Sequence, residues 1–233
     1  VVEAVFEDRG LKAQITRKLD AVLPAHAVIA SNTSALPISE LAEAGAHPEN
    51  FIGMHFFSPV ERMPLVEIIR GRKTSPETLA RALDLVQAMK KTPIVVNDGP
   101  GFFTSRFIGA YINESLAMVT EGVSPALIEN AAKMAGIPVG PLPVSDEIGL
   151  DPAYHASQQR KKDEGDAFKP TPTFKLVEKL VGELGRHGRK NGKGFFEYAE
   201  DGSKLLWPGL AELFPRLAEQ PTVDEVKARM LYA

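Results

Sequence analysis

Short apolar runs alternate with helical patterns through the first 98 residues, and this alternation constrains the fold more than any other feature. Five runs have the length and the Val, Ile and Phe content of buried strands, at residues 1–6, 28–30, 51–57, 65–69 and 93–96. Residues 7–20 and 76–90, which lie between such runs, repeat apolar side chains at helical spacing. Strands that alternate with helices predict an α/β fold with a mainly parallel sheet.

The pattern changes after residue 98, where strand-like runs almost disappear. Helices are expected at residues 102–120, 124–136, 146–162 and 173–184, with a last one that begins at residue 223. One short strand is expected at residues 195–198. We therefore predict two domains, an α/β domain over residues 1–98 and an all-α domain over residues 99–233.

Composition and charge exclude several classes of function. The chain has 27 basic and 30 acidic residues and a formal net charge of −3, so it lacks the basic excess of a nucleic-acid-binding protein. It has no cysteine, which excludes thiolate metal ligands and cysteine nucleophiles. No histidine spacing typical of a metal site is present, and no apolar run reaches the ~20 residues that span a bilayer. We predict no metal site, no nucleic-acid partner and no membrane insertion.

His55 is the histidine whose surroundings best fit a catalytic site. It lies at the end of an apolar run, in Gly-Met-His-Phe-Phe-Ser-Pro, and ligands bind α/β sheets at strand ends. Glu67 lies within the apolar run Leu-Val-Glu-Ile-Ile, where a buried carboxylate needs a partner. A turn between the two runs would place Glu67 beside His55, as the group that orients a catalytic base. Two alternatives stay open: a buried structural histidine, and a glutamate that faces solvent on an edge strand.

Ser34 ends the polar stretch Ser-Asn-Thr-Ser that follows the second apolar run. These residue types favour turns, so the residues alone predict a turn and nothing further. The sequence contains neither Gly-x-Gly-x-x-Gly nor a P-loop motif, so no phosphate-binding turn can be placed in it.

Three stretches together resemble the 3-hydroxyacyl-CoA dehydrogenase family. They are residues 31–38, residues 53–69 with the His-Phe-Phe segment and its later glutamate, and residues 98–106, which read Asp-Gly-Pro-Gly-Phe-Phe-Thr-Ser-Arg. The resemblance covers nearly the whole chain. It implies that residues 1–98 are the C-terminal half of a Rossmann-type NAD-binding domain, followed by a helical domain for substrate binding and dimerisation.

The resemblance also implies roles for individual residues. His55 matches the catalytic base, and Glu67 matches the carboxylate that holds it. Ser34 matches a serine that contacts the substrate hydroxyl and the nicotinamide. Ser105 stands where the family often has an asparagine that contacts substrate. Residues that match the NAD site are Glu7, Lys12, Ser34, Ser58 and Lys190.

The activity that the resemblance implies is NAD-dependent oxidation of L-3-hydroxyacyl-CoA to 3-oxoacyl-CoA in fatty-acid β-oxidation. His55 would remove the proton from the 3-hydroxyl as hydride leaves C3 for the nicotinamide. Two other functions stay open. One is a related 3-hydroxybutyryl-CoA or hydroxy-acid dehydrogenase, and the other is a non-catalytic acyl-CoA-binding or assembly module of the same family.

Both ends of the sequence suggest a piece of a longer protein. The family's Gly-rich phosphate turn would precede residue 1, and a new helix begins at residue 223. We expect a fragment of a multifunctional fatty-acid oxidation protein that also carries an enoyl-CoA hydratase, and we expect these residues alone to be inactive. The parent protein would be a homodimer or part of a thiolase-containing complex in the bacterial cytoplasm, with the mitochondrial matrix as the alternative.

Overall fold

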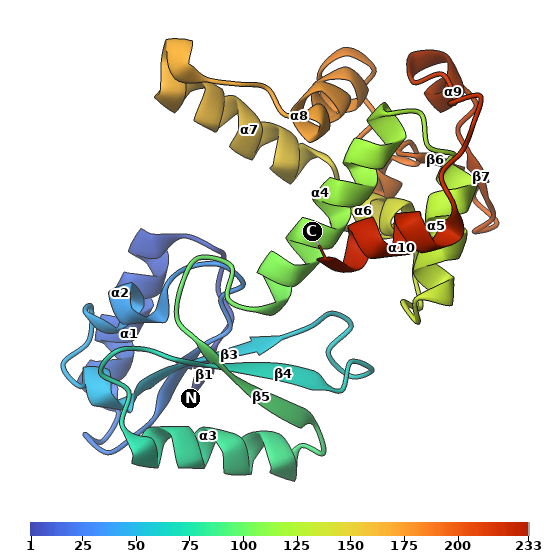
Figure 1. Cartoon of the computed structure of the whole chain (residues 1–233). Helices are drawn as coiled ribbons and strands as arrows, with labels where there is room; N and C mark the ends of the chain where they lie inside the picture. Colours follow the sequence, from blue (N-terminus) through green and yellow to red (C-terminus); the bar gives the residue numbers. More distant parts are fainter. Residues whose placement is uncertain (233) are drawn as a thin grey trace. The chain divides into compact units, whose positions relative to one another are not determined.

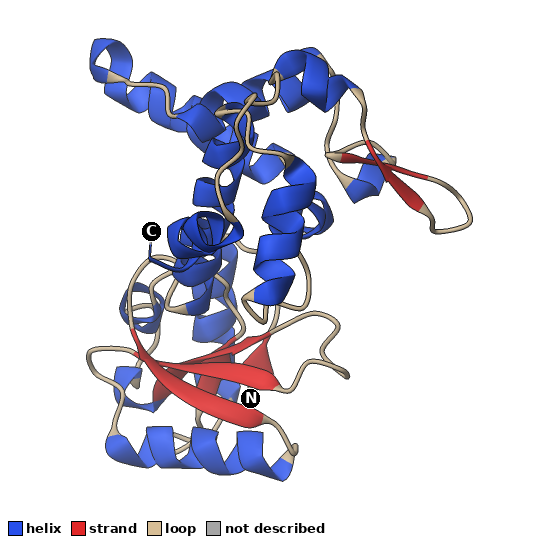
Figure 2. Ribbon diagram, turned by 45° about the vertical axis from the view of Figure 1, so that its right-hand side comes forward, coloured by secondary structure: helices blue, strands red, loops and turns tan. Residues whose placement is uncertain are grey.

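The computed structural model describes residues 1–232. The chain folds into two compact units, of which the first spans Val1–Phe107 and the second begins at Ile108. The first unit is a β-sheet with helices, and the second is mostly helical (Figure 1 and Figure 2). The predicted order of an α/β region followed by a helical region is confirmed.

The first unit contains a five-stranded sheet in the order β1-β2-β3-β4-β5. The strands are β1 (Val2–Glu3), β2 (Ile29–Ser31), β3 (Phe51–Phe56), β4 (Leu65–Arg70) and β5 (Thr92–Asn97). β3 and β4 pair antiparallel, and every other neighbouring pair is parallel. The predicted mainly parallel sheet is therefore confirmed, with one antiparallel pair inside it.

Helices cover both faces of this sheet (Figure 1). They are α1 (Arg9–Val22), α2 (Ile38–Ala42) and α3 (Pro76–Ala88), with a 3₁₀ turn η1 (Pro48–Asn50) before β3. Phe51 of β3 packs in one apolar cluster with α2, and the next residue, Ile52, packs in the other cluster with α3. Burial on both faces explains why these strands are continuous apolar runs in the sequence.

The strand predicted over residues 1–6 is shorter in the structure, because pairing ends at Glu3. Beyond it the Val5 N–H donates to Glu3 Oε2 at 3.1 Å, and Lys12 Nζ donates to the Val5 carbonyl at 3.2 Å. Side chains thus take the hydrogen bonds that a neighbouring strand would otherwise supply. The helix predicted from residue 7 begins at Arg9, where the Asp8 carboxylate accepts the Leu11 N–H at 2.7 Å.

The second unit is built from helices and one hairpin. The helices are α4 (Thr104–Thr120), which begins in the first unit, α5 (Pro125–Met134), α6 (Pro141–Ile148), α7 (Asp151–Glu164), α8 (Pro172–Val177), α9 (Gly209–Leu213) and α10 (Val223–Tyr232). Shorter helical turns are η2 (Gly165–Ala167), the π-helical η3 (Glu178–Glu183) and η4 (Arg189–Asn191). β6 (Phe196–Tyr198) and β7 (Lys204–Leu206) form an antiparallel hairpin, which confirms the short strand predicted there.

The single helix predicted over residues 146–162 is wrong, because two helices occupy this region. α6 ends at Ile148, and the φ of +92° at the next residue, Gly149, lies in the left-handed region that glycine adopts without a Cβ penalty. α7 then starts with Pro152 in its first turn, where the missing N–H costs nothing.

Asp146, at the end of α6, connects that helix to the β6 segment. Its carboxylate is buried and accepts the Phe195 and Phe196 N–H groups at 2.8 and 3.0 Å and the Tyr198 hydroxyl at 3.0 Å. Gly194 passes so close that a Cβ there would lie 1.9 Å from Asp146 Oδ1. The sequence therefore needs glycine at position 194 for space.

Gly194→Ala is expected to lower the free energy of unfolding by about 1–3 kcal/mol, the usual cost of overpacking a filled site. The matched control is Gly109→Ala inside α4, where a Cβ meets no heavy atom within 4 Å. That change should raise stability by about 0.5–1 kcal/mol, because alanine favours the helix. Urea unfolding, followed by the fluorescence of the single tryptophan, Trp207, would measure both. Unchanged stability of Gly194→Ala would contradict the expectation.

Candidate active site

The β3–β4 hairpin places His55 directly opposite Glu67. His55 Nδ1 lies 2.7 Å from Glu67 Oε2. Both side chains are buried, with His55 6% exposed and Glu67 fully buried. β4 lies between β3 and β5, so the alternative of a solvent-facing glutamate on an edge strand is wrong. The two residues are thus brought together by a single hairpin, as predicted.

Glu67 also holds the start of α4. Its Oε1 accepts the Phe103 and Thr104 N–H groups at 3.2 and 2.8 Å, and its Oε2 accepts the Thr104 hydroxyl at 2.6 Å. The left-handed residues Gly101 (φ +71°) and Phe102 (φ +46°) turn the chain immediately before these donors. A carboxylate at a helix N-terminus is favoured by the helix dipole. Glu67 is therefore both the partner of His55 and the cap of α4.

These donors keep Glu67 ionised. Burial by itself would raise the pKa of the Glu67 carboxyl, but hydrogen bonds from Thr104 and His55 outweigh it and lower the pKa below its ordinary value of 4.5. An ionised carboxylate only accepts hydrogen bonds, so His55 Nδ1 carries a proton, and in the neutral imidazole the lone pair is on Nε2. The rings of Phe57 and Phe102 lie 4.5 and 6.2 Å from the imidazole centroid. The pair therefore presents a histidine in the tautomer that a general base requires.

The lowered pKa of Glu67 predicts a loss of stability in acid. A carboxyl whose folded pKa lies below its unfolded value stabilises the fold above the unfolded pKa, and this contribution is lost as the pH falls through the folded pKa. Urea unfolding followed by circular dichroism at steps between pH 7 and about pH 3 should show the decline below about 4.5. Glu67→Gln should show a smaller decline, and an equal decline in both proteins would count against this account.

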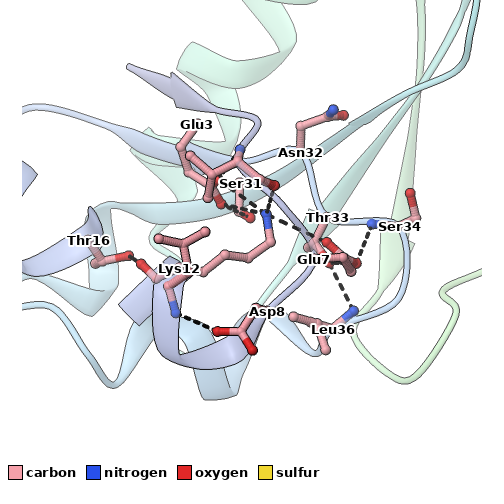
Figure 3. Close-up of polar contacts among 12 residues, drawn as sticks. Glu3, Glu7, Asp8, Lys12, Thr16, Ser31, Asn32, Thr33, Ser34 and Leu36 are labelled. Atoms are coloured by element: carbon pink, nitrogen blue, oxygen red, sulfur yellow. Dashed lines mark hydrogen bonds and ion pairs between the residues drawn. The ribbon is translucent and has the colours of Figure 1, made fainter. Parts of the chain in front are cut away.

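A second cluster surrounds Glu7, which follows β1 (Figure 3). Glu7 Oε1 accepts the Thr33 hydroxyl at 2.5 Å and the Ser34 and Ala35 N–H groups at 3.0 and 3.2 Å. Partial burial alone would raise the pKa of the Glu7 carboxyl, but these hydrogen bonds and the charge of Lys12 lower it. The Glu7 side chain stays 38% exposed, beyond the carboxyl ends of parallel β1 and β2, which is where dinucleotides bind such sheets.

Lys12 is buried, with 1% of its surface exposed. Its ammonium group donates to both Glu3 carboxylate oxygens at 3.1 and 3.2 Å and lies 3.6 Å from Glu7 Oε2. Lys12 therefore faces the interior beside Glu7. Its predicted contact with NAD stays a prediction.

The Ser34 turn and the histidine lie at the same end of the sheet. β2 and β3 are parallel, and Asn32 Oδ1 accepts the N–H of Phe56, the neighbour of His55, at 2.8 Å. Ser105 Oγ donates to the Ser34 carbonyl at 3.4 Å, which brings these two predicted residues together.

Ser58 and Lys190 are the other two predicted site residues. Ser58 is exposed in the turn that follows β3. Lys190 lies in the second unit, where its ammonium group pairs with Asp151 Oδ1 at 2.5 Å. The binding roles predicted for Ser58 and Lys190 stay predictions.

Sequence reasoning missed several residues that build this region. Thr104 donates twice to Glu67, and its position at the start of a long helix was a signal for a capping role. Thr33 binds Glu7, and Glu3 binds Lys12. Asp98 caps α2 by accepting the Ile38 and Ser39 N–H groups, each at 2.8 Å. The carboxylates of Glu3 and Asp98 gave no local signal, because their partners lie far away in the sequence.

Family models match both parts of the chain. The NAD-binding domain of 3-hydroxyacyl-CoA dehydrogenase matches residues 1–99, and the C-terminal domain of the same enzyme matches residues 101–198. The chain belongs to the 3-hydroxyacyl-CoA dehydrogenase family. The resemblance predicted from the three sequence stretches is thus confirmed.

Individual relatives agree with this family. The fatty acid oxidation complex subunit alpha of Shewanella baltica is 47% identical over 204 residues, which are 88% of this chain and 28% of that protein. The chain therefore spans less than a third of the length of this relative. The crystal structure of (S)-3-hydroxybutyryl-CoA dehydrogenase from Ralstonia eutropha is 36% identical, with a TM-score of 0.74 over 86% of this chain and 70% of that one. The dehydrogenase part of multifunctional enzyme 1 from C. elegans is 29% identical, with a TM-score of 0.70 over 99% of this chain and 53% of that one.

Proposed function

We propose that the protein containing this chain catalyses the NAD-dependent oxidation of L-3-hydroxyacyl-CoA to 3-oxoacyl-CoA in fatty-acid β-oxidation. The observation that carries the proposal is the buried pair of His55 and Glu67, with 2.7 Å between Nδ1 and Oε2. The pair holds the imidazole in one tautomer at the end of a strand, as abstraction of a hydroxyl proton requires. Family membership supports the reaction type.

His55 Nε2 takes the proton of the 3-hydroxyl in this reaction. The imidazolium that forms is stabilised by the Glu67 carboxylate, which already holds Nδ1–H and stays ionised. NAD, when bound, supplies the hydride acceptor for C3. In the reverse direction the same imidazolium returns its proton to the 3-oxo oxygen as the hydroxyl forms.

The first unit has groups that fit the nicotinamide end of NAD. The exposed carboxylate of Glu7 can accept hydrogen bonds from ribose hydroxyls, and Ser34 lies next to it at the carboxyl ends of the parallel strands. We propose Glu7, Lys12, Ser34 and Ser58 as cofactor contacts, and Ser34 and Ser105 as substrate contacts. We propose Lys190 as a further cofactor contact from the helical part.

The names of the relatives support the substrate class and an assembly. They name a 3-hydroxybutyryl-CoA dehydrogenase and a subunit of a fatty acid oxidation complex. We propose that this chain acts on acyl-CoA and works within such a complex, in the cytoplasm of a bacterium. Within the described residues, no helix is both long and apolar enough to cross a membrane.

We also propose a division between an NAD-binding domain over residues 1–98 and a helical domain that follows. The two family models meet close to this position, between residues 99 and 101. The boundary between the two compact units lies a few residues later, after Phe107 and inside α4. The first turn of that helix belongs to the first unit because it binds Glu67. Limited proteolysis of the full-length enzyme, with mass spectrometry of the products, would locate the exposed linker.

An assay of the full-length enzyme with acetoacetyl-CoA and NADH tests the proposed activity. We expect loss of NADH absorbance and formation of L-3-hydroxybutyryl-CoA. Oxidation of NADH with a free oxo acid and not with its CoA ester would support the hydroxy-acid dehydrogenase alternative. Binding of acyl-CoA without turnover would support the non-catalytic alternative and overturn the proposal.

A further inference from the structure

Glu3 lies at the centre of a buried polar cluster beside Glu7 (Figure 3). Its side chain accepts hydrogen bonds from the Ser31 hydroxyl, from Lys12 Nζ and from the Val5 N–H. Glu3 is 6% exposed, Lys12 1% and Ser31 fully buried. A buried carboxylate and a buried ammonium group are costly to desolvate, so their geometry must be well satisfied for the fold to tolerate them.

Lys12 connects this cluster to the turn that carries Ser34. Its ammonium group binds Glu3 and the Val5 carbonyl and lies 3.6 Å from Glu7 Oε2. The other Glu7 oxygen, Oε1, holds the Thr33 hydroxyl and the Ser34 N–H. One cation therefore lies between a buried carboxylate and the carboxylate that orders the turn.

The turn itself is held almost entirely by these side chains. Ala35 N–H donates to Glu7 and Thr33, and Leu36 N–H donates to Thr33 Oγ1 at 2.9 Å. Figure 3 shows the Ser34 hydroxyl pointing away from Glu7, on the opposite side from the buried cluster. Glu7 bonds the backbone of this turn and not the Ser34 hydroxyl. Displacement of Glu7 would therefore change the position of the hydroxyl but not the groups that contact it.

We propose that Glu3, Lys12 and Ser31 form a positioning cluster that fixes Glu7 and, through Glu7, the turn that presents Ser34. Glu3 and Ser31 act through Lys12 and contact neither substrate nor cofactor. The effect of the cluster on turnover rests on the proposed function of Ser34, whereas its effect on the order of the turn does not. Order and turnover can therefore be measured separately.

The first test is hydrogen–deuterium exchange of the full-length enzyme that carries Glu3→Gln together with Lys12→Met. The double variant removes both buried charges at once, so neither is left unpaired. We expect the amides of residues 34–36 to exchange at least tenfold faster, because the anchor of Glu7 is lost. Amides of α3 should keep their protection, which shows that the unit is folded. Unchanged exchange at residues 34–36 would overturn the proposal.

A milder variant covers the case in which the double variant fails to fold. Ser31→Ala removes one donor to Glu3 and leaves Lys12 in place. We expect about fivefold faster exchange at residues 34–36, the factor that corresponds to one lost hydrogen bond. The control is Lys18→Met, at an exposed position of α1, the helix that carries Lys12. It should leave exchange at residues 34–36 unchanged. Equal exchange in Ser31→Ala and Lys18→Met would overturn the proposal.

Kinetics of the same variants separate positioning from simple stabilisation. Ser31→Ala, which leaves Lys12 and its proposed contact with NAD in place, should show a lowered kcat, because Ser34 is misplaced in the step that it serves. The KM for acyl-CoA should change by less than the drop in kcat. Faster exchange of residues 34–36 with normal kcat would refute the link to catalysis. An inactive parent enzyme would instead refute the proposed function and leave the exchange result as the test of the cluster.

Discussion

His55→Gln is expected to lower the kcat of the full-length enzyme by about 10²–10⁴-fold, the usual contribution of a positioned general base. Glutamine fills a similar volume, but it cannot accept a proton from the 3-hydroxyl. Burial beside Phe57 and Phe102 limits access of water that could replace the base. Steady-state kinetics with acetoacetyl-CoA and NADH, and in the reverse direction, would measure the loss.

A matched control distinguishes this loss from a general effect of removing a histidine. His47→Gln removes a partly exposed histidine that pairs with Glu49 in the same unit, and turnover should be unchanged. Turnover of His55→Gln close to that of the parent enzyme would leave only the alternative of a structural histidine.

Glu67→Gln is expected to lower kcat by a similar factor, about 10²–10⁴-fold, with the histidine still present. The amide must direct its NH₂ group either at His55 Nδ1 or at the Phe103 and Thr104 N–H groups. Backbone N–H groups cannot become acceptors, whereas an imidazole can change tautomer. The NH₂ group will therefore face His55, and the proton will move to Nε2, the atom that must accept the substrate proton.

The measurement combines kinetics with the state of the imidazole. NMR of ¹⁵N-labelled histidine should report protonated Nε2 in Glu67→Gln and protonated Nδ1 in the parent. Glu61→Gln, at an exposed position in the turn of the same hairpin, is the control and should leave kcat unchanged. Normal turnover in Glu67→Gln would show that the carboxylate does not orient the base.

The periodicity of the sequence was sufficient to predict the class of fold. The strands can be recognised in the sequence because both faces of β3 and β4 are buried, so apart from His55, Glu67 and Arg70 these strands carry no polar side chain. Errors occurred where a single residue ends an element. Gly149 divides one expected helix into two, and side chains replace strand pairing after Glu3. Such endings depend on hydrogen bonds that periodicity does not contain.

Part of the candidate site was also accessible from local pattern. A histidine at a strand end, followed by a glutamate inside the next apolar run, predicted the hairpin pair of His55 and Glu67. The prediction succeeded because a hairpin joins residues that are near in sequence, and because a buried carboxylate needs a partner.

Only the tertiary structure showed which further groups hold the site. Glu67 caps the start of α4 at Thr104 across 37 residues, and Ser31 reaches Glu3 across 28 residues. The resemblance indicated a role for Lys12 at the NAD site, but not that its side chain is buried between two carboxylates. Short-range periodicity reports which faces of an element are apolar, whereas the partners of a buried charge depend on how distant segments pack.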